Sequence, residues 1–174
     1  MQKSDFKSVI TLYVELILIA LLGALIFVSF FLRWCTVDGS SMEKTLSDGQ
    51  HLIVSDLFYS PRRGDVIVFH QTGNSKNEPL VKRVIALPGD EIRFDGQKVY
   101  VNGEKINEEY AFFDPTRPGI KMSEDAVIIP EGYVFVMGDN RNNSLDSRSS
   151  DIGLVDTRRI IGRVLFRIAP MTFY

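Results

Sequence analysis

The 174-residue sequence has little cysteine, little histidine and no block of like charge. Its single cysteine, Cys35, excludes a disulfide within the chain and a metal site built from several cysteines. Two histidines, His51 and His70, are too few for a typical zinc site, so the sequence implies no metal or organic cofactor. The 20 basic and 22 acidic residues nearly cancel to a net charge of −2. Without a basic block, nucleic acid is not an expected partner.

One long apolar run lies near the N-terminus. Between Val9 and Leu32, Glu15 is the only charged residue. A helix rises about 1.5 Å per residue and needs roughly 20 residues to cross the hydrocarbon core of a bilayer, so this run can span a membrane. We therefore expect a short N-terminal segment at residues 1–8, a transmembrane anchor at 9–32 and a single folded domain at 33–174.

A cleaved secretory signal is the alternative interpretation of this run. The run is longer than the roughly 7–15 apolar residues of a signal peptide, and residues 32–35, LRWC, offer no small-x-small cleavage site. An uncleaved anchor is therefore favoured. Lys3 and Lys7 precede the run and Arg33 follows it, which favours a cytoplasmic N-terminus. The sequence thus predicts a single-pass protein of the cell membrane whose domain lies on the extracytoplasmic face.

Short runs of Val, Ile, Phe and Tyr separated by turn residues follow the anchor, a pattern typical of strands. Asp95-Gly96 and Asn102-Gly103 are dipeptides that accept positive φ, so they predict consecutive hairpins between residues 91 and 106. Helical periodicity is scarce, and the expected fold class is mostly β, with antiparallel strands. The expected strands are 51–54, 65–70, 80–87, 91–94, 97–101, 126–129, 133–137 and 160–168.

Three short segments are notable because they occur together. Residues 39–46 read GSSMEKTL, residues 81–90 read VKRVIALPGD, and residues 137–148 read MGDNRNNSLDSR. Their order, their distance from the apolar run and the chain length resemble the small, single-span members of the bacterial type I signal peptidases. The resemblance implies a β-rich catalytic domain behind one transmembrane helix. It also implies removal of signal peptides from exported preproteins, next to the lipid bilayer and in proximity to the export translocon.

In this resemblance Ser41 matches the family's nucleophile and Lys82 matches its general base. A serine hydroxyl is a poor nucleophile until a base removes its proton, and an amine can do so only when neutral. An exposed lysine has a pKa of about 10.4 and is almost entirely charged at neutral pH. The amine must therefore be buried, because burial lowers its pKa. On a strand, Lys82 points to the same side as Leu80 and Val84, while Arg83 points to the other. We expect activity to rise with an apparent pKa well below that of free lysine.

The resemblance also assigns supporting residues. Ser144 matches the residue that hydrogen-bonds and orients the lysine, and Asp146 and Arg148 match an ion pair that braces the loop behind the site. The backbone N–H of Ser41 is one candidate donor to the oxyanion. Gly39 stands where some members carry a serine whose hydroxyl is the second donor. A backbone amide or a water molecule must substitute for it here.

The sequence departs from the family pattern at Lys44. The family usually has proline two residues after the methionine that follows the nucleophile, which is Met42 here. Residues 41–44 consequently also read Ser-x-x-Lys, the signature of penicillin-recognising enzymes. The downstream Ser-Asp-Asn and Lys-Thr-Gly motifs of those enzymes are missing from the sequence. Lys82 is therefore favoured over Lys44 as the base.

Two further alternatives remain open. A Ser-His-Asp triad using His51 or His70 is chemically feasible, although nothing in the local sequence supports it. A catalytically silent, anchored homologue that binds signal peptides or a secretion partner without cutting is the alternative from a different functional class. Turnover of a synthetic signal peptide by the purified protein discriminates between a peptidase and a binder.

Overall fold

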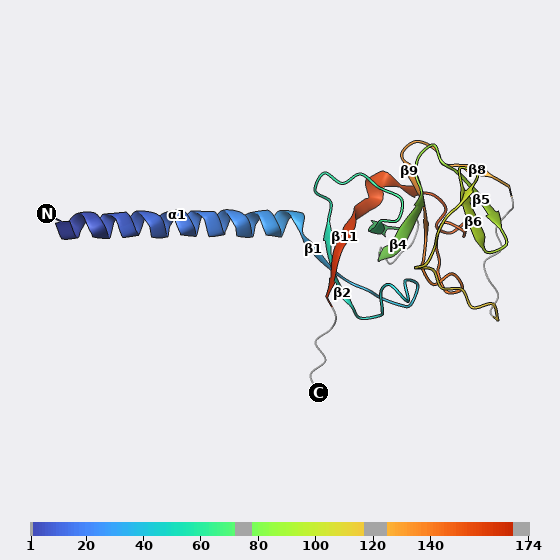
Figure 1. Cartoon of the computed structure of the whole chain (residues 1–174), viewed down its shortest axis with the longest axis horizontal. Coiled ribbons are helices and arrows are strands. Elements are labelled where there is room, and N and C mark those ends of the chain that lie inside the picture. The colour runs from blue at the N-terminus through green and yellow to red at the C-terminus, as the bar shows by residue number, and fades with distance from the viewer. Residues whose placement is uncertain (1, 72–77, 117–124, 169–174) are drawn as a thin grey trace, which may run out of the picture. The chain divides into compact units, whose positions relative to one another are not determined.

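The computed structural model describes residues 2–71, 78–116 and 125–168, so the last six residues of the expected domain lie outside it. The chain divides into two compact units, Met1–Arg33 and Trp34–Tyr174 (Figure 1). The first unit holds one helix. The second unit, called the body below, holds the strands.

Helix α1 (Gln2–Phe31) forms the first unit. Within the 25 residues Lys7–Phe31, the most apolar 18-residue stretch has a mean hydropathy of 2.7, and none of it is buried within the protein. By length and composition this helix can cross a bilayer. The expected N-terminal apolar helix is therefore present, and it begins several residues before the apolar run does.

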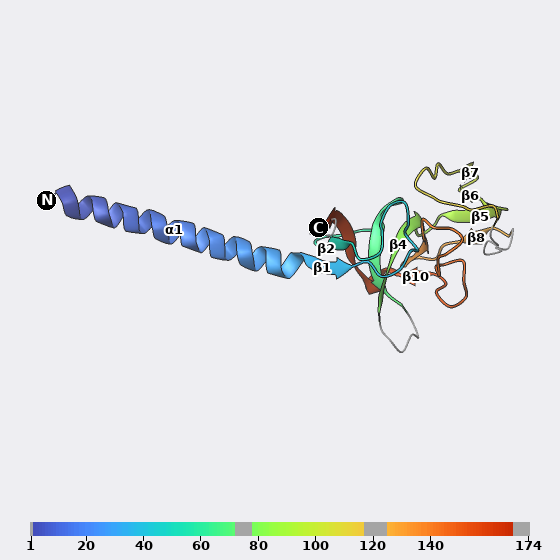
Figure 2. The same cartoon turned by 90° about the horizontal axis from the view of Figure 1, so that it is seen from below.

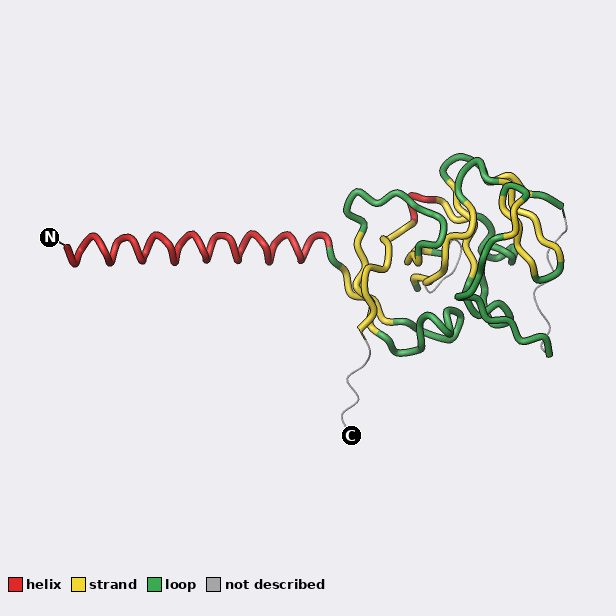
Figure 3. The backbone as a smooth tube through the Cα atoms, in the orientation of Figure 1, coloured by secondary structure: helices red, strands yellow, loops and turns green. Residues whose placement is uncertain are grey.

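A seven-stranded sheet forms most of the body, with neighbouring strands in the order β1-β2-β11-β3-β4-β9-β10. The pairs from β2 onward are antiparallel, as the sequence predicted. Figure 3 shows the strands in yellow, joined by long green loops. The strands are β1 (Arg33–Thr36), β2 (His51–Ser55), β3 (Val66–His70), β4 (Pro79–Ala86), β9 (Tyr133–Met137), β10 (Val155–Asp156) and β11 (Ile160–Ile168), with a 3-10 turn, η1 (Thr157–Arg159), before the last.

A four-stranded sheet follows β4 in the sequence, in the order β7-β6-β5-β8. Figures 1 and 2 show it at the end of the body away from β1 and β2. Its strands are β5 (Glu91–Asp95), β6 (Lys98–Val101), β7 (Glu104–Lys105) and β8 (Val127–Ile128).

The predicted consecutive hairpins are present in this sheet, with one turn shifted. Val101 pairs with Glu104, so Asn102 and Gly103 form the second turn with φ of 53° and 81°. Asp95 pairs with Lys98, which places the first turn at residues 96–97 rather than at the predicted Asp95-Gly96. The reason is that Gly96, with φ of 58°, takes the first central position, where a type II′ turn requires glycine.

The core is continuous through both faces of strand β4. Val81 packs with one buried cluster, Val84 with a second and Ile85 with a third. The third cluster joins β4 and β9 to the inner face of the small sheet. Core therefore packs on both sides of the strand. An ionisable side chain on β4 is consequently shielded from water.

Strands β1 and β10 are the elements of the large sheet that the sequence did not predict. Strand β1 follows directly on the apolar run, so its own alternation could not be separated from that run. Strand β10 has only two residues, which is too short for periodicity to be visible.

We expect Gly162→Ala to lower the free energy of unfolding by about 3 kcal/mol, because a Cβ there would lie 2.5 Å from the Ser55 carbonyl oxygen. Gly153→Ala is the matched control. Its φ of 57° is also left-handed but its Cβ would meet open space, so its expected cost is about 1 kcal/mol. Chemical denaturation of the detergent-solubilised chain, followed by the fluorescence of Trp34, measures both. Equal unfolding midpoints would contradict the prediction.

Candidate active site

Ser41 lies on a tight turn between β1 and β2, here called the Ser41 turn (residues 40–46). The Glu43 N–H donates to the Ser40 carbonyl at 3.1 Å, and the Leu46 N–H donates to the Met42 carbonyl at 2.8 Å. Met42 and Leu46 are both buried in the core cluster that also contains β2 residues. These apolar anchors hold the turn on the core and leave Ser41 partly exposed.

The amine of Lys82 lies against Ser41. Its Nζ donates to Ser41 Oγ at 2.8 Å and to the Val81 carbonyl at 2.9 Å, and Lys82 is only 3% exposed. Burial lowers the pKa of the Lys82 amine to about 8, while the negative charges of Asp146 and Asp139 act in the opposite direction. The side chain thus combines contact with a hydroxyl and a strong tendency to lose its proton.

Arg83, the next residue on β4, has a different set of partners. Its guanidinium makes a bidentate pair with Asp139, with Nε at 2.9 Å from Oδ1 and Nη2 at 2.7 Å from Oδ2. Thr45 Oγ1 donates to the same carboxylate at 2.5 Å, and the Tyr110 ring stacks on the guanidinium at 4.1 Å. This buried pair therefore links β4, the Ser41 turn and the segment after β9.

Asp146 and Arg148 form the ion pair that the resemblance implied. Two guanidinium nitrogens of Arg148 each lie 2.8 Å from the Asp146 carboxylate, and both side chains are almost fully buried. The Gly138 N–H also donates to Asp146 at 2.9 Å. Burial favours the neutral acid, but the hydrogen bonds and the positive charge of Arg148 hold the pKa of Asp146 below its usual range.

Ser144 is buried close to Gly138 and to the backbone of Ser41. A Cβ on Gly138 would overlap Ser144 Oγ and would lie 2.5 Å from the Ser41 carbonyl oxygen. Only glycine therefore allows the segment after β9 to approach the Ser41 turn this closely. Within the described residues, Ser144 Oγ has no hydrogen-bond partner. The implied hydrogen bond to Lys82 is not formed in this structure, so the role of Ser144 stays a prediction.

Two asparagines fasten the segment after β9 to the Ser41 turn. The Asn140 backbone N–H donates to the Ser41 carbonyl at 3.0 Å, and Asn140 Nδ2 donates to the Ser40 carbonyl at 3.2 Å. Asn143 Nδ2 donates to Ser40 Oγ at 2.7 Å. Sequence reasoning missed these contacts and the Arg83–Asp139 pair, although all of these residues belong to the three segments that carry the resemblance.

A cavity of about 320 Å³ opens beside Ser41 and Lys82. Gly39 lies on its wall, and its N–H donates to Asp48 Oδ1 at 2.8 Å. In the parts of the chain that the structure describes, no group of three His, Cys, Asp or Glu side chains is placed to hold a metal ion. The remaining wall is formed by Thr36, Val37, Asp38, Ser40, Met42, Pro79, Leu80, Val81, Asn143 and Leu145.

Lys44 does not replace Lys82 beside the serine. The Ser-x-x-Lys arrangement requires a helix, but the Ser41 turn is not helical. The Lys44 amine lies 5.3 Å from the centre of the Phe112 ring. Lys44 has a φ of 77°, a value that proline cannot adopt. Lys44 therefore stands at a position whose backbone conformation excludes proline.

In the described part of the chain, neither histidine is hydrogen-bonded to the Ser41 hydroxyl. His51 Nδ1 is 3.1 Å from Thr36 Oγ1, and its ring meets the edge of Trp34. His70 is exposed at the end of β3. Among the described residues, the side chain that hydrogen-bonds to Ser41 Oγ is that of Lys82, which gives the histidine triad no support.

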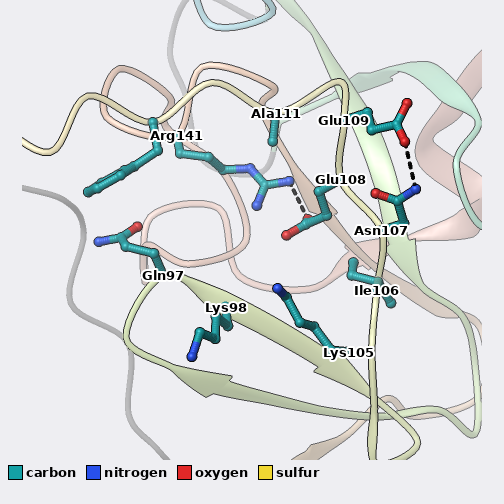
Figure 4. Close-up of a pocket in the computed structure, with 10 residues that line it drawn as sticks. Gln97, Lys98, Lys105, Ile106, Asn107, Glu108, Glu109, Ala111 and Arg141 are labelled. Atoms are coloured by element: carbon teal, nitrogen blue, oxygen red, sulfur yellow. Dashed lines mark hydrogen bonds and ion pairs between the residues drawn. The ribbon is translucent and has the colours of Figure 1, made fainter.

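A larger cavity, of about 550 Å³, lies beside the small sheet. Figure 4 shows Arg141 pointing to Glu108 across its wall, and the two side chains form an ion pair. Arg141 Nε also donates to the Gly138 carbonyl at 3.0 Å. Among the described residues, its wall contains no serine, threonine or cysteine and so offers no hydroxyl or thiol nucleophile of these types. Arg141, on the wall of this cavity, thus braces the turn at Gly138.

An antiparallel β domain that presents a serine hydroxyl to a buried amine in a cleft has the features of a serine hydrolase. Comparison with known proteins identifies the family. The family described as "Signal peptidase, peptidase S26" matches residues 10–169. The chain belongs to this signal peptidase I family, whose members are serine peptidases.

Relatives match over nearly the whole chain. Signal peptidase I of Bacillus licheniformis is 37% identical, over 97% of this chain and 94% of its own length. Signal peptidase IB of Staphylococcus aureus is 32% identical, over 99% of this chain and 93% of its own. A solved signal peptidase I from Enterococcus faecalis V583 is 29% identical with a TM-score of 0.51, covering 62% of this chain and 98% of that one.

Gly138→Ala should lower the rate of signal-peptide cleavage roughly 100-fold, because the new methyl group would push Ser144 and the Ser41 turn apart, and small misplacements of reacting groups have effects of this size. Gly153→Ala, whose Cβ meets open space, is the control. Thermal unfolding of both variants separates loss of geometry from loss of fold. A Gly138→Ala enzyme with the wild-type rate would show that the close approach is unimportant.

Proposed function

We propose that this chain is a membrane-bound serine endopeptidase that removes N-terminal signal peptides from exported preproteins, with Ser41 as nucleophile and Lys82 as general base. The observation that carries the proposal is the 2.8 Å contact between the buried Lys82 amine and the Ser41 hydroxyl. A hydroxyl and a base within hydrogen-bond reach are the minimum that nucleophilic catalysis by serine requires.

The lowered pKa of Lys82 allows the amine in this contact to act as a base. With a pKa of about 8 instead of 10.5, the neutral fraction of the amine at pH 7 increases roughly 300-fold. Activity should therefore rise with pH as the amine loses its proton and level off above pH 8. A base with a pKa close to the working pH is also suited to returning the proton.

The reaction follows from these two groups. Neutral Lys82 takes the proton of Ser41 Oγ as the oxygen attacks the scissile carbonyl, and the carbonyl oxygen becomes an oxyanion. The resulting ammonium of Lys82 then protonates the leaving amine, which yields the mature protein and an acyl-enzyme on Ser41. Lys82 next takes a proton from water, and the resulting attack releases the signal peptide and restores Ser41.

The supporting residues act through position and charge. Met42 anchors the Ser41 turn in the core, and the pair of Asp146 with Arg148 fixes Gly138 through its N–H. Because Asp146 is already paired with a cation, its negative charge only partly opposes the loss of the Lys82 proton. Ser144 is assigned the role of orienting the Lys82 amine, and its buried Oγ, which has no hydrogen-bond partner among the described residues, supports this role.

The membrane arrangement is part of the proposal. Residues 9–32 anchor the chain, residues 1–8 are cytoplasmic, and residues 33–174 form the extracytoplasmic catalytic domain. The length and apolar character of α1 support the anchor, and Lys3 and Lys7 before it support the orientation. The partners are then signal peptides of preproteins and the lipid bilayer, in proximity to the export translocon, and the reaction needs no cofactor.

A silent homologue that only binds signal peptides is the second candidate. The change at Lys44 motivates it, because this residue stands two positions after Met42 in the Ser41 turn. The buried amine beside Ser41 argues against it, because burying a lysine amine is costly and a protein that only binds peptides gains nothing from this cost.

Ser41→Ala and Lys82→Met should each lower cleavage of a synthetic signal peptide by roughly 10⁴-fold or more, since each removes one half of a unit that acts together. The detergent-solubilised full chain is assayed by separation of the cleaved products. Lys44→Ala is the control, expected to remain within about threefold of wild type because its amine contacts Phe112 rather than Ser41.

Three outcomes would contradict parts of this account. Substantial cleavage by Ser41→Ala or Lys82→Met would remove that residue from the chemistry. Loss of activity in Lys44→Ala with retention in Lys82→Met would establish the Ser-x-x-Lys arrangement instead. A wild-type chain that binds the peptide without turnover would identify a silent homologue.

A further inference from the structure

The oxyanion that forms on the scissile carbonyl needs preorganised hydrogen-bond donors close to Ser41. Gly39 has no side chain to donate. Its backbone N–H is also committed, because it donates to Asp48 Oδ1 at 2.8 Å. Neither the side chain nor the N–H of Gly39 can therefore serve as the second donor beside the Ser41 N–H.

We propose that the hydroxyl of Ser40 is this second oxyanion donor and that Asn143 holds it in position. The assignment rests on the proposed function of Ser41. Ser40, Ser41 and Asn143 all line the cavity that also contains Lys82. Asn143 Nδ2 lies 2.7 Å from Ser40 Oγ, and an amide nitrogen can only donate. Ser40 Oγ is consequently the acceptor, and its own proton remains available to the oxyanion.

The peptide unit between Ser40 and Ser41 is fixed through its carbonyl group. The Ser40 carbonyl accepts from the Glu43 N–H at 3.1 Å and from Asn140 Nδ2 at 3.2 Å. The described peptide bonds are all trans, and in a trans unit the C=O and N–H point in opposite directions. Holding the Ser40 carbonyl therefore directs the Ser41 N–H away from Asn140. Among the described residues, no group accepts a hydrogen bond from this N–H.

A role of the Ser40 hydroxyl in forming the turn would require a different hydrogen bond. Serine at the start of a turn ordinarily accepts from a backbone N–H two or three residues later through its side chain. Here the Glu43 N–H goes to the Ser40 carbonyl instead. The Ser40 hydroxyl thus takes no part in forming the turn, and the Asn143 side chain, from the segment after β9, holds it.

The experiment uses the detergent-solubilised full chain and a synthetic signal peptide. Ser40→Ala should lower kcat roughly 100-fold, the usual effect of removing one oxyanion donor, with KM changed by no more than about twofold. Ser40→Thr keeps the hydroxyl and should retain most of the activity. The midpoint of the pH–rate profile should not move in either variant, because Ser40 does not act on Lys82.

Inhibitor binding distinguishes an oxyanion donor from a structural serine. A peptide aldehyde forms a tetrahedral adduct with Ser41, whereas the matched peptide alcohol does not. Ser40→Ala should weaken the aldehyde by the same factor as kcat and leave the alcohol unchanged. Asn143→Ala should lower kcat in the wild-type background and have no effect in the Ser40→Ala background, because Asn143 acts through Ser40.

The assignment is overturned if Ser40→Ala stays within about twofold of wild type, if both inhibitors weaken together, or if the effect of Asn143→Ala persists in the Ser40→Ala background. Failure of the proposed function gives a different result. In that case the wild-type chain itself shows no turnover, or Ser41→Ala cleaves as well as wild type, and the assignment falls with it. An active wild type with an unaffected Ser40→Ala overturns the assignment alone.

Discussion

The burial of the Lys82 amine against the Ser41 hydroxyl is the constraint on which the rest of the site depends. A charged amine is costly to remove from water, so a lysine on a strand with core on both sides tends to lose its proton. Strand β4 provides this environment because its residues pack into three buried clusters. In the proposed mechanism this environment makes the Lys82 side chain a base, and the buried Met42 holds the turn that carries Ser41.

Carboxylates close to such an amine would restore its proton unless their charge is balanced. Asp146 and Asp139 both lie near enough to raise the pKa of Lys82, and each is paired with an arginine. The Asp146–Arg148 pair holds Gly138, and the Arg83–Asp139 pair holds Thr45. The same two ion pairs therefore fix the geometry of the site and limit the charge that the amine senses.

Local pattern predicted much of the fold, including the apolar helix, the antiparallel strands and the hairpins after β4. Alternation along β4 predicted different surroundings for Lys82 and Arg83, and the resemblance to signal peptidases implied the pair of Asp146 with Arg148. Contacts between distant segments could not be predicted this way. Arg83 and Asp139 are 56 residues apart, and the pairing depends on strand register. The close approach at Gly138 likewise depends on packing that no local pattern encodes.

The central claim is that Lys82 is neutral enough to act as a base, and a direct titration of this side chain tests it. The ¹³Cε resonance of Lys82 can be assigned by its loss in Lys82→Met and followed against pH by NMR in the substrate-free, detergent-solubilised chain. The account predicts a pKa of about 8. A value near 10.5, the ordinary value for lysine, would contradict it.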